Sequence, residues 1–192
     1  MRSELNRSES GYSLAELLVV IAIIGVLSLI SVPAFINFKN QNTFRADLRN
    51  FANDLRAARQ YAITQTVDVR VELDVPGNSL TSNTYRFYSS NDRGATWTAL
   101  SISGGHGITP GTTGNIKNLD GPVWIQSTVS LLDIGNDGKP DLVFHPSGTM
   151  DLAANAAAGQ VVLRSSWQNI AFDTFTIALS PSGQFTSTGS HS

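Results

Sequence analysis

The chain has 192 residues, a formal net charge of −2 at pH 7 and no cysteine. The absence of cysteine excludes disulfides, thiolate metal sites and cysteine nucleophiles, and the slightly acidic balance supplies no overall positive field for nucleic acid. Hydrophobic residues make up 41% of the chain, and a good part of them lies in one segment near the N-terminus. The remainder suits a single domain of about 130 residues.

The apolar segment covers residues 17–38, which are twenty-two consecutive uncharged residues. Since about 20 residues at roughly 1.5 Å each cross the hydrocarbon core of a bilayer, the segment predicts a membrane-spanning helix. A secretory signal would have a shorter apolar core, followed by a small-residue cleavage site. Residues 32–35, Val-Pro-Ala-Phe, offer no convincing site of that kind, so we expect the helix to stay on the mature chain.

Glu16 stands directly before this segment. A charged side chain costs about 2.5–3.5 kcal/mol at the middle of a bilayer and less near its edge, so its position needs a reason. Glu16 is either an interfacial carboxylate that reaches water or a functional group. Residues 11–16, Gly-Tyr-Ser-Leu-Ala-Glu, favour the second reading, because they resemble the processing site of type IV prepilins and type II secretion pseudopilins. The resemblance implies that a prepilin peptidase cleaves between Gly11 and Tyr12 and that the new N-terminus, Tyr12, is methylated.

The resemblance also implies roles in filament assembly. In these families the fifth residue after the cut is a glutamate, here Glu16, whose carboxylate is thought to meet the N-terminal ammonium of a neighbouring subunit. A proline, here Pro33, commonly interrupts the apolar helix. Pairing would make the buried charge tolerable. The sequence departs from the family pattern in two ways: Tyr12 stands where phenylalanine is usual, and the leader, residues 1–11, balances two arginines with two glutamates instead of being basic.

Beyond Pro33 an apolar stripe is spaced four, three, four, three and four residues apart, which is typical of an amphipathic helix packed on a domain. The members of the stripe are Phe44, Leu48, Phe51, Leu55, Ala58 and Ala62. We therefore expect one helix of about 50 residues, with residues 12–38 in the membrane and residues 39–65 against the domain. Because proline removes a backbone hydrogen bond, a bend is expected near Pro33.

The same helix carries the basic stripe of the sequence. Its members are Arg45, Arg49, Arg56 and Arg59, while Asp47 and Asp54 lie on another side. These arginines are candidate contacts for nucleic-acid phosphates. The interspersed acids and the lack of aromatic residues on that face favour a solvated or subunit-facing surface instead.

From residue 67 onward the apolar period changes to two. Residues 67–74 alternate Val or Leu with charged side chains, which predicts a half-buried strand ending at a turn at 76–79. Further strands are expected at residues 85–90, 96–101, 123–126, 129–134, 142–145, 160–164 and 175–179. The glycine- and threonine-rich segment 103–115 predicts a mobile loop. The sequence thus predicts an α+β fold: a long N-terminal helix packed on an antiparallel β-rich domain, residues 66–186, with a flexible tail at 187–192.

Two strand–turn segments extend the resemblance. Residues 142–148 and 177–184 are similar in character to elements of the GspH/FimT branch of minor pseudopilins and pilins. Some FimT-like members bind DNA through arginines in a C-terminal glycine turn. Here Gln184 follows Gly183 and no cation comes after it, so we expect that DNA site to be missing.

Residues 90–97 are similar to the Asp-box hairpin of sialidase propellers. A propeller needs repeated copies, and this one stands alone. We therefore interpret the segment as a hairpin in which Asp92 and Gly94 serve the turn, and we expect no sialidase activity.

Residues 133–141, Asp-Ile-Gly-Asn-Asp-Gly-Lys-Pro-Asp, form a candidate calcium loop. Asp133, Asp137 and Asp141 occupy its first, fifth and ninth places and Gly138 its sixth, as in loops that bind hard cations through oxygen. The third place holds a glycine instead of a ligand, and the twelfth holds a phenylalanine instead of a bidentate glutamate. The alternative is a polar hairpin turn around Asp137 and Gly138, which needs no ion.

Catalytic motifs are missing from the sequence. His106, His145 and His191 are scattered, and neither H-E-x-x-H nor G-x-S-x-G occurs. Segment 103–115 also lacks the glycine motifs that cradle phosphate. We expect no enzymatic activity and no cofactor apart from the candidate calcium.

The residues and the resemblance together predict a minor pseudopilin or minor pilin of the GspH/FimT type. It would be a single-pass inner-membrane protein with its domain in the periplasm. Its partners would be other (pseudo)pilins in a filament, the prepilin peptidase, the inner-membrane assembly platform and membrane lipid. The alternative is a filament-associated binding module that captures DNA or another extracellular ligand. The sequence leaves open whether the host machine secretes proteins, builds a pilus or imports DNA.

Overall fold

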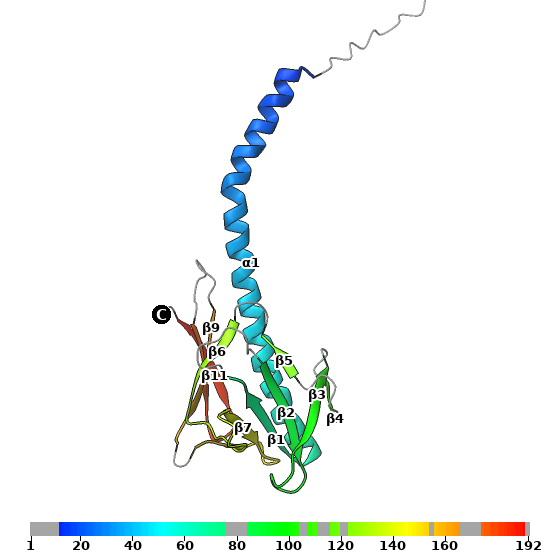
Figure 1. Cartoon of the computed structure of the whole chain (residues 1–192), viewed down its shortest axis with the longest axis vertical. Helices are drawn as coiled ribbons and strands as arrows, with labels where there is room; N and C mark the ends of the chain where they lie inside the picture. Colours follow the sequence, from blue (N-terminus) through cyan, green and yellow to red (C-terminus); the bar gives the residue numbers. More distant parts are fainter. Residues whose placement is uncertain are drawn as a thin grey trace, which may run out of the picture. The chain divides into compact units, whose positions relative to one another are not determined.

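The computed structural model of the chain describes residues 12–75, 84–103, 107–110, 116–119, 123–153, 156–165 and 174–190. The chain divides into two compact units, residues 1–39 and residues 40–192. In the described ranges one helix, α1, is followed by the strands β1 to β11 (Figure 1). The predicted leader with Gly11, the predicted turn at 76–79, and His106 and His191 lie outside the described residues.

Helix α1 spans Leu14–Gln65. Its N-terminus is capped by Ser13, whose Oγ accepts a 3.1 Å hydrogen bond from the backbone N–H of Ala15. The helix continues through Pro33, and the bend expected there stays a prediction. At the C-terminal end Thr66 has a φ of 56°, and the N–H of Val67 donates to the carbonyl of Ala62 at 3.2 Å. A left-handed residue with this backward bond is a Schellman-type end, which satisfies a terminal carbonyl.

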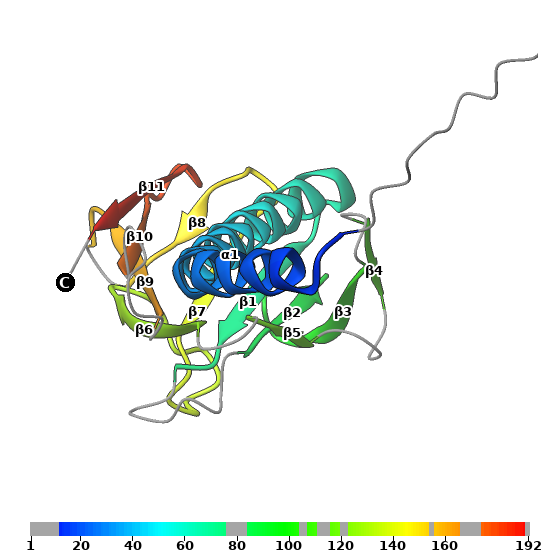
Figure 2. The ribbon, with the colours of Figure 1, turned by 90° about the horizontal axis from the view of Figure 1, so that it is seen from above.

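The second half of α1 forms part of the core of the unit made of residues 40–192. The predicted apolar stripe is confirmed, because all six of its members are buried. They join one cluster with buried side chains from both β-sheets, and Figure 2 shows the two sheets on different sides of the helix. Burial of each Leu- or Phe-sized side chain is worth about 1.5–3 kcal/mol, so this stripe attaches the helix to the sheets.

The first sheet has the strand order β4-β3-β2-β1-β7-β8, with β5 paired to β2 outside this path. Its strands are β1 (Asp68–Leu73), β2 (Thr84–Ser90), β3 (Thr98–Ser103), β4 (Gly107–Pro110), β5 (Ile116–Asn118), β7 (Asp141–Phe144) and β8 (Met150–Asp151). All of its pairs are antiparallel. Strand β1 is central, because Val69 lies opposite Ser89 of β2 on one side and Phe144 of β7 on the other.

The second sheet is antiparallel and has the order β11-β10-β9-β6. Its strands are β6 (Val123–Val129), β9 (Gly159–Ser165), β10 (Thr174–Leu179) and β11 (Phe185–Ser190). The α+β class predicted from the sequence is thus confirmed, with the helix packed on antiparallel sheets.

Three details of the strand prediction are wrong. Residues 129–134 are not a strand, because Ser130 adopts a φ of 57° after β6 and only Leu132 bridges to Asp141. Segment 103–115, expected to be a loop, contains β4. The tail expected at 187–192 belongs to β11 as far as Ser190. Polar strands such as β11 are held by backbone pairing with a neighbour, which leaves no apolar period in the sequence.

Strand β1 also differs from its prediction, because both of its faces are buried. Val69, Val71 and Leu73 are fully buried in the core, as the alternation predicts. The charged residues between them, Asp68, Arg70 and Glu72, are only 8–9% exposed. An alternating pattern predicts which residues share a face, but it does not reveal that charged and aromatic side chains cover the polar face.

Candidate functional site

The apolar segment of α1 is exposed along its length. Its large apolar side chains from Leu14 to Phe38 are 46–77% exposed. Among the described residues, α1 is the one helix long and apolar enough to cross a membrane. Ser28 satisfies its hydroxyl within the helix by donating to the carbonyl of Ile24 at 2.7 Å, an arrangement that lets a hydroxyl lie in lipid.

Glu16 lies in the first turn of this helix, with its side chain exposed. It stands three residues after the capping Ser13, where a capping-box glutamate would accept a bond from the N–H of that serine. Instead, the N–H of Ala15 donates to Oγ of Ser13 at 3.1 Å. The N–H of Glu16 donates to the carbonyl of Ser13 at 3.0 Å. Within the described part of the chain, the Glu16 carboxylate has no hydrogen-bond or ion-pair partner, so it is available to a group outside it.

Of the four arginines in the predicted basic stripe, Arg59 has a structural role. Its Nε donates to the carbonyl of Gly148 at 2.9 Å, and one terminal nitrogen donates to the carbonyl of Ser182 at 3.2 Å. These carbonyls belong to the two strand–turn segments identified in the sequence, which pack together, since the N–H of Met150 also donates to the carbonyl of Pro181. Arg59 therefore ties both turns to α1 and is not free to bind phosphate.

The other three arginines of the stripe, Arg45, Arg49 and Arg56, are exposed and line a groove of about 510 Å³. The guanidinium of Arg56 is oriented by two contacts. It donates to Oδ1 of Asn53 at 2.8 Å and lies 5.3 Å from the ring centroid of Phe185. The second contact is a cation–π interaction, and it places this charge at the boundary between α1 and β11.

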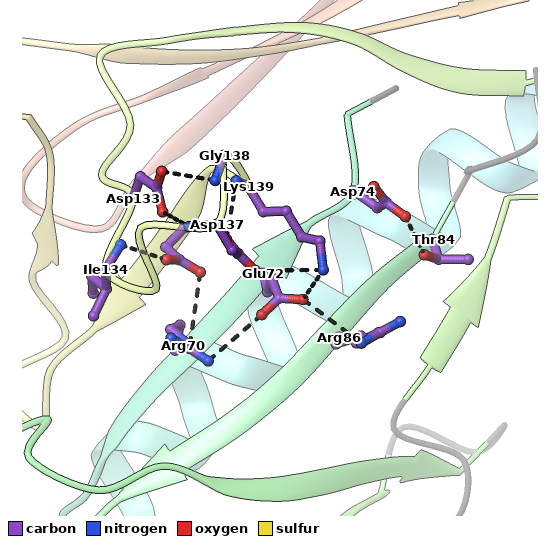
Figure 3. A network of polar contacts seen from close by, with 11 residues as sticks. Arg70, Glu72, Asp74, Thr84, Arg86, Asp133, Ile134, Asp137, Gly138 and Lys139 are labelled. Carbon is purple, nitrogen blue, oxygen red and sulfur yellow. Dashed lines mark hydrogen bonds and ion pairs between the residues drawn. The ribbon is translucent and has the colours of Figure 1, made fainter. Parts of the chain in front are cut away.

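The predicted calcium loop folds as a turn that uses its carboxylates internally (Figure 3). The two carboxylate oxygens of Asp133 accept the backbone N–H groups of Asp137 and Gly138 at 3.2 and 3.0 Å. Oδ1 of Asp137 accepts the N–H of Lys139 at 3.1 Å, and Gly138 has a φ of 79°. Among the described residues no group of three or more acidic or histidine side chains is placed to hold a metal ion. The geometry favours the polar turn.

Asp141, the ninth residue of that loop, is the first residue of β7 and lies beside Arg70 of β1. It is 1% exposed, its Oδ2 accepts the N–H of Ile134 at 2.8 Å, and its Oδ1 lies 3.7 Å from Nε of Arg70. Burial raises the pKa of Asp141, although the Ile134 N–H and the Arg70 charge act in the opposite direction. The charge of Arg70 is compensated by Asp141 and by Glu72 at 3.6 Å.

Aromatic rings complete the cover over β1. The guanidinium of Arg70 lies 4.6 Å from the ring of Tyr88 and 5.0 Å from that of Trp97. Trp97 is the last residue of the Asp-box segment, whose predicted turn is confirmed: Asp92 accepts hydrogen bonds from the Ser90 hydroxyl at 2.6 Å and from the Thr96 N–H at 2.9 Å. These bonds lower the pKa of Asp92 to about 2. Gly94 supplies the left-handed residue of the turn, with a φ of 87°.

His145, one of the scattered histidines, follows β7 directly and lies between two carboxylates. Its Nδ1 is 2.7 Å from Asp68 Oδ1, and its Nε2 is 2.9 Å from Asp151 Oδ2. Partial burial lowers the pKa of His145, but the bonds to Asp68 and Asp151 outweigh that effect and raise it. Since both ring nitrogens are engaged, His145 has none left to activate a nucleophile.

Comparison with known proteins assigns the chain to a family. Residues 6–32 match the model of the prokaryotic N-terminal methylation motif, and residues 47–189 match the model of the type II transport protein GspH. No curated protein matches the chain. Among solved structures, the chain is similar to the minor pseudopilin EPSH from the type II secretion system of Vibrio cholerae, with 12% identity, 79% of this chain and 97% of that chain covered, and a TM-score of 0.47.

The methylation motif contains the predicted cleavage site and Glu16, and the GspH match contains the second half of α1 and most of the β-structure. Members of this family are structural proteins. Because the GspH model matches most of its length and the prepilin-type motif precedes it, the chain belongs to the GspH family of type II transport proteins.

Proposed function

We propose that the chain joins the pseudopilus through α1, with Glu16 as the residue that sets its position among the neighbouring helices. The observation that carries this proposal is the combination of an apolar segment that is exposed along its length with one exposed carboxylate at its start. An unpaired charge is costly in an apolar bundle, whereas a paired one is tolerated. The ammonium group of a neighbouring subunit is a partner of the right charge.

The processing steps follow from the same segment. Cleavage between Gly11 and Tyr12 by the prepilin peptidase creates an N-terminus, and methylation of Tyr12 leaves its positive charge in place. Tyr12 then stands one residue before the capping Ser13, at the start of α1. Each processed chain would thus offer a cation and, four residues later, an anion, which allows head-to-side pairing from subunit to subunit.

This assembly requires that the chain is anchored in the inner membrane. Residues 12–38 would cross the lipid once, the unit of residues 40–192 would lie in the periplasm, and the inner-membrane assembly platform would add the subunit to the filament. Because the chain has no cysteine, a Ser190→Cys variant would provide a single thiol for testing this orientation. We expect a membrane-impermeant maleimide to label that thiol in spheroplasts. Labelling only after membrane lysis would contradict the periplasmic placement.

The decisive experiment replaces Glu16 by glutamine in cells that express the whole secretion system. We expect Glu16→Gln to be cleaved and methylated as the wild type is, but to be lost from sheared pseudopili. Mass spectrometry of the N-terminus measures processing, and immunoblotting of the sheared fraction measures incorporation. Gly11→Ala should remain uncut, which separates a failure of processing from a failure of assembly.

Ser13→Ala is the matched control, because it removes the helix cap and keeps the carboxylate. If Glu16 acts through helix capping, Ser13→Ala and Glu16→Gln should reduce incorporation to a similar degree. If it acts through pairing with a neighbour, Ser13→Ala should be incorporated normally. Normal incorporation of Glu16→Gln would overturn the proposal.

A further inference from the structure

A groove of about 510 Å³ lies beside the second half of α1 in the unit of residues 40–192. We call it the arginine groove. It is lined by Arg45, Leu48, Arg49, Ala52, Asn53, Arg56, Phe175 and Ser187. The helix supplies the first six of these residues, β10 supplies Phe175, and β11 supplies Ser187.

The charge of the arginine groove has one sign. Three arginines line it, and none of its lining residues is acidic. The two aspartates of the same helix segment are buried, and Asp54 accepts a hydrogen bond from Tyr85. Leu48 and Phe175 add apolar surface between the guanidinium groups. A ligand that fits must therefore carry negative charges on a partly apolar body.

The second observation is the open edge of β11. This strand ends the second sheet and, among the described strands, pairs only with β10. Its sequence, Phe-Thr-Ser-Thr-Gly-Ser, has no charge and no proline, and residues 186–190 are exposed. Natural sheet edges are usually protected by charges, prolines or bulges. An unprotected edge accepts an added strand through its free backbone groups.

Ser187 connects the two observations, because it belongs to β11 and also lines the arginine groove. We propose that an extended acidic peptide segment of another protein subunit binds here, adding as a strand beside β11 while its carboxylates pair with Arg49 and Arg56. A peptide fits better than a nucleic acid, because the β11 edge offers backbone donors and acceptors that only another peptide backbone matches in register. This inference does not involve Glu16, so it can fail while the proposed role of α1 holds.

The test uses the full chain in detergent micelles and a fluorescent peptide that alternates threonine with glutamate over six residues, the length of β11. We expect saturable binding that weakens as salt is added. The same peptide with glutamine in place of glutamate should bind at least about tenfold more weakly, since its charge-assisted bonds are lost. A version with alternate backbone amides methylated should also lose binding, because it cannot pair with a strand. Equal binding of either control peptide would overturn the proposal.

Variants of the chain locate the site. Arg49→Gln and Arg56→Gln should each weaken binding about tenfold, while Arg93→Gln, a change of equal charge at an exposed arginine of the turn between β2 and β3, should leave it unchanged. An equal loss in all three variants would show a non-specific charge effect and overturn the proposal. Displacement of the peptide by a single-stranded oligonucleotide at lower concentration than by unlabelled peptide would assign the groove to nucleic acid. Self-association that Arg49→Gln abolishes would assign it to a second copy of the chain.

Discussion

The hydroxyl of Tyr85 donates a 2.8 Å hydrogen bond to Oδ2 of Asp54, which joins β2 to α1 through a buried polar contact. Tyr85 is 3% exposed and Asp54 is 7% exposed. Burial, followed by the charge of Asp54, raises the pKa of Tyr85 far above its ordinary value, so the hydroxyl remains a donor at every physiological pH. The ring of Phe51 packs edge-on against Tyr85 at 4.9 Å. The helix segment is thus fixed on the sheet by a directional bond as well as by apolar packing.

Replacing Tyr85 by phenylalanine tests this contact. The change keeps the ring but leaves a buried carboxylate without its donor, so we expect the free energy of unfolding to fall by about 1–3 kcal/mol. Denaturant unfolding followed by near-ultraviolet circular dichroism measures it. Tyr61→Phe is the matched control, because Tyr61 is only partly buried and packs at the margin of the core. Its effect should stay within about 0.5 kcal/mol, and equal effects of the two changes would contradict the role of the hydroxyl.

The sequence was sufficient to predict the helix and its buried stripe, because the core side of an amphipathic helix is recorded in the spacing of its apolar residues. It also predicted most of the strands, since β1 alternates and the others are short apolar runs between turns. Strands β4, β5, β8 and β11 were missed for a physical reason. They are short or polar, and each is held by backbone pairing with another strand, which leaves no apolar period in the sequence.

The polar contacts of the fold were not predictable in the same way. Arg59 appeared as one member of a basic stripe, yet its two acceptors lie 89 and 123 residues further along the chain. His145 appeared as an isolated histidine, yet one of its carboxylate partners is 77 residues away. Spacing within a helix shows which residues share a face, but the partner on the other side is set by the topology of the sheets.

The histidine between two carboxylates predicts that stability depends on pH. Because the pKa of His145 is raised in the folded protein, its stabilising contribution is complete below the ordinary value of 6.5 and is lost as the pH rises through the folded pKa. We expect the melting temperature to fall across that interval, measured by thermal unfolding from about pH 5.5 to about pH 8.5. His145→Gln should remove this component, and Asp151→Asn should shift it to lower pH. An unchanged pH profile in His145→Gln would contradict the assignment.

The turn at residues 133–141 predicts the outcome of a calcium titration. The Asp133 carboxylate already accepts two backbone N–H groups, and Asp141 faces Arg70. We therefore expect isothermal titration of the full chain in detergent with millimolar calcium to give no heat of binding, with magnesium as the matched control. Heat with calcium alone that Asp133→Asn abolishes would contradict this expectation and establish the loop as a calcium site.

Gly183 lies in the second strand–turn segment, and its close packing predicts that Gly183→Ala and Gly138→Ala destabilise the fold to different degrees. Gly183 and Gly138 have φ values of 72° and 79°, so alanine is strained at both, by about 1–2 kcal/mol. A Cβ at Gly138 would meet nothing within 4 Å, whereas a Cβ at Gly183 would collide with the carbonyl oxygen of Gly148 and lie 2.7 Å from Nε of Arg59.

We therefore expect Gly183→Ala to lower the free energy of unfolding more than Gly138→Ala does, as measured by denaturant unfolding. The additional loss reflects the bond between Arg59 and Gly148, which the new methyl group would push apart. In the background of Arg59→Ala this additional loss should shrink, because one of the two colliding groups is then gone. If Gly183→Ala and Gly138→Ala were equally destabilising, the close packing of the two turns against Arg59 would be contradicted.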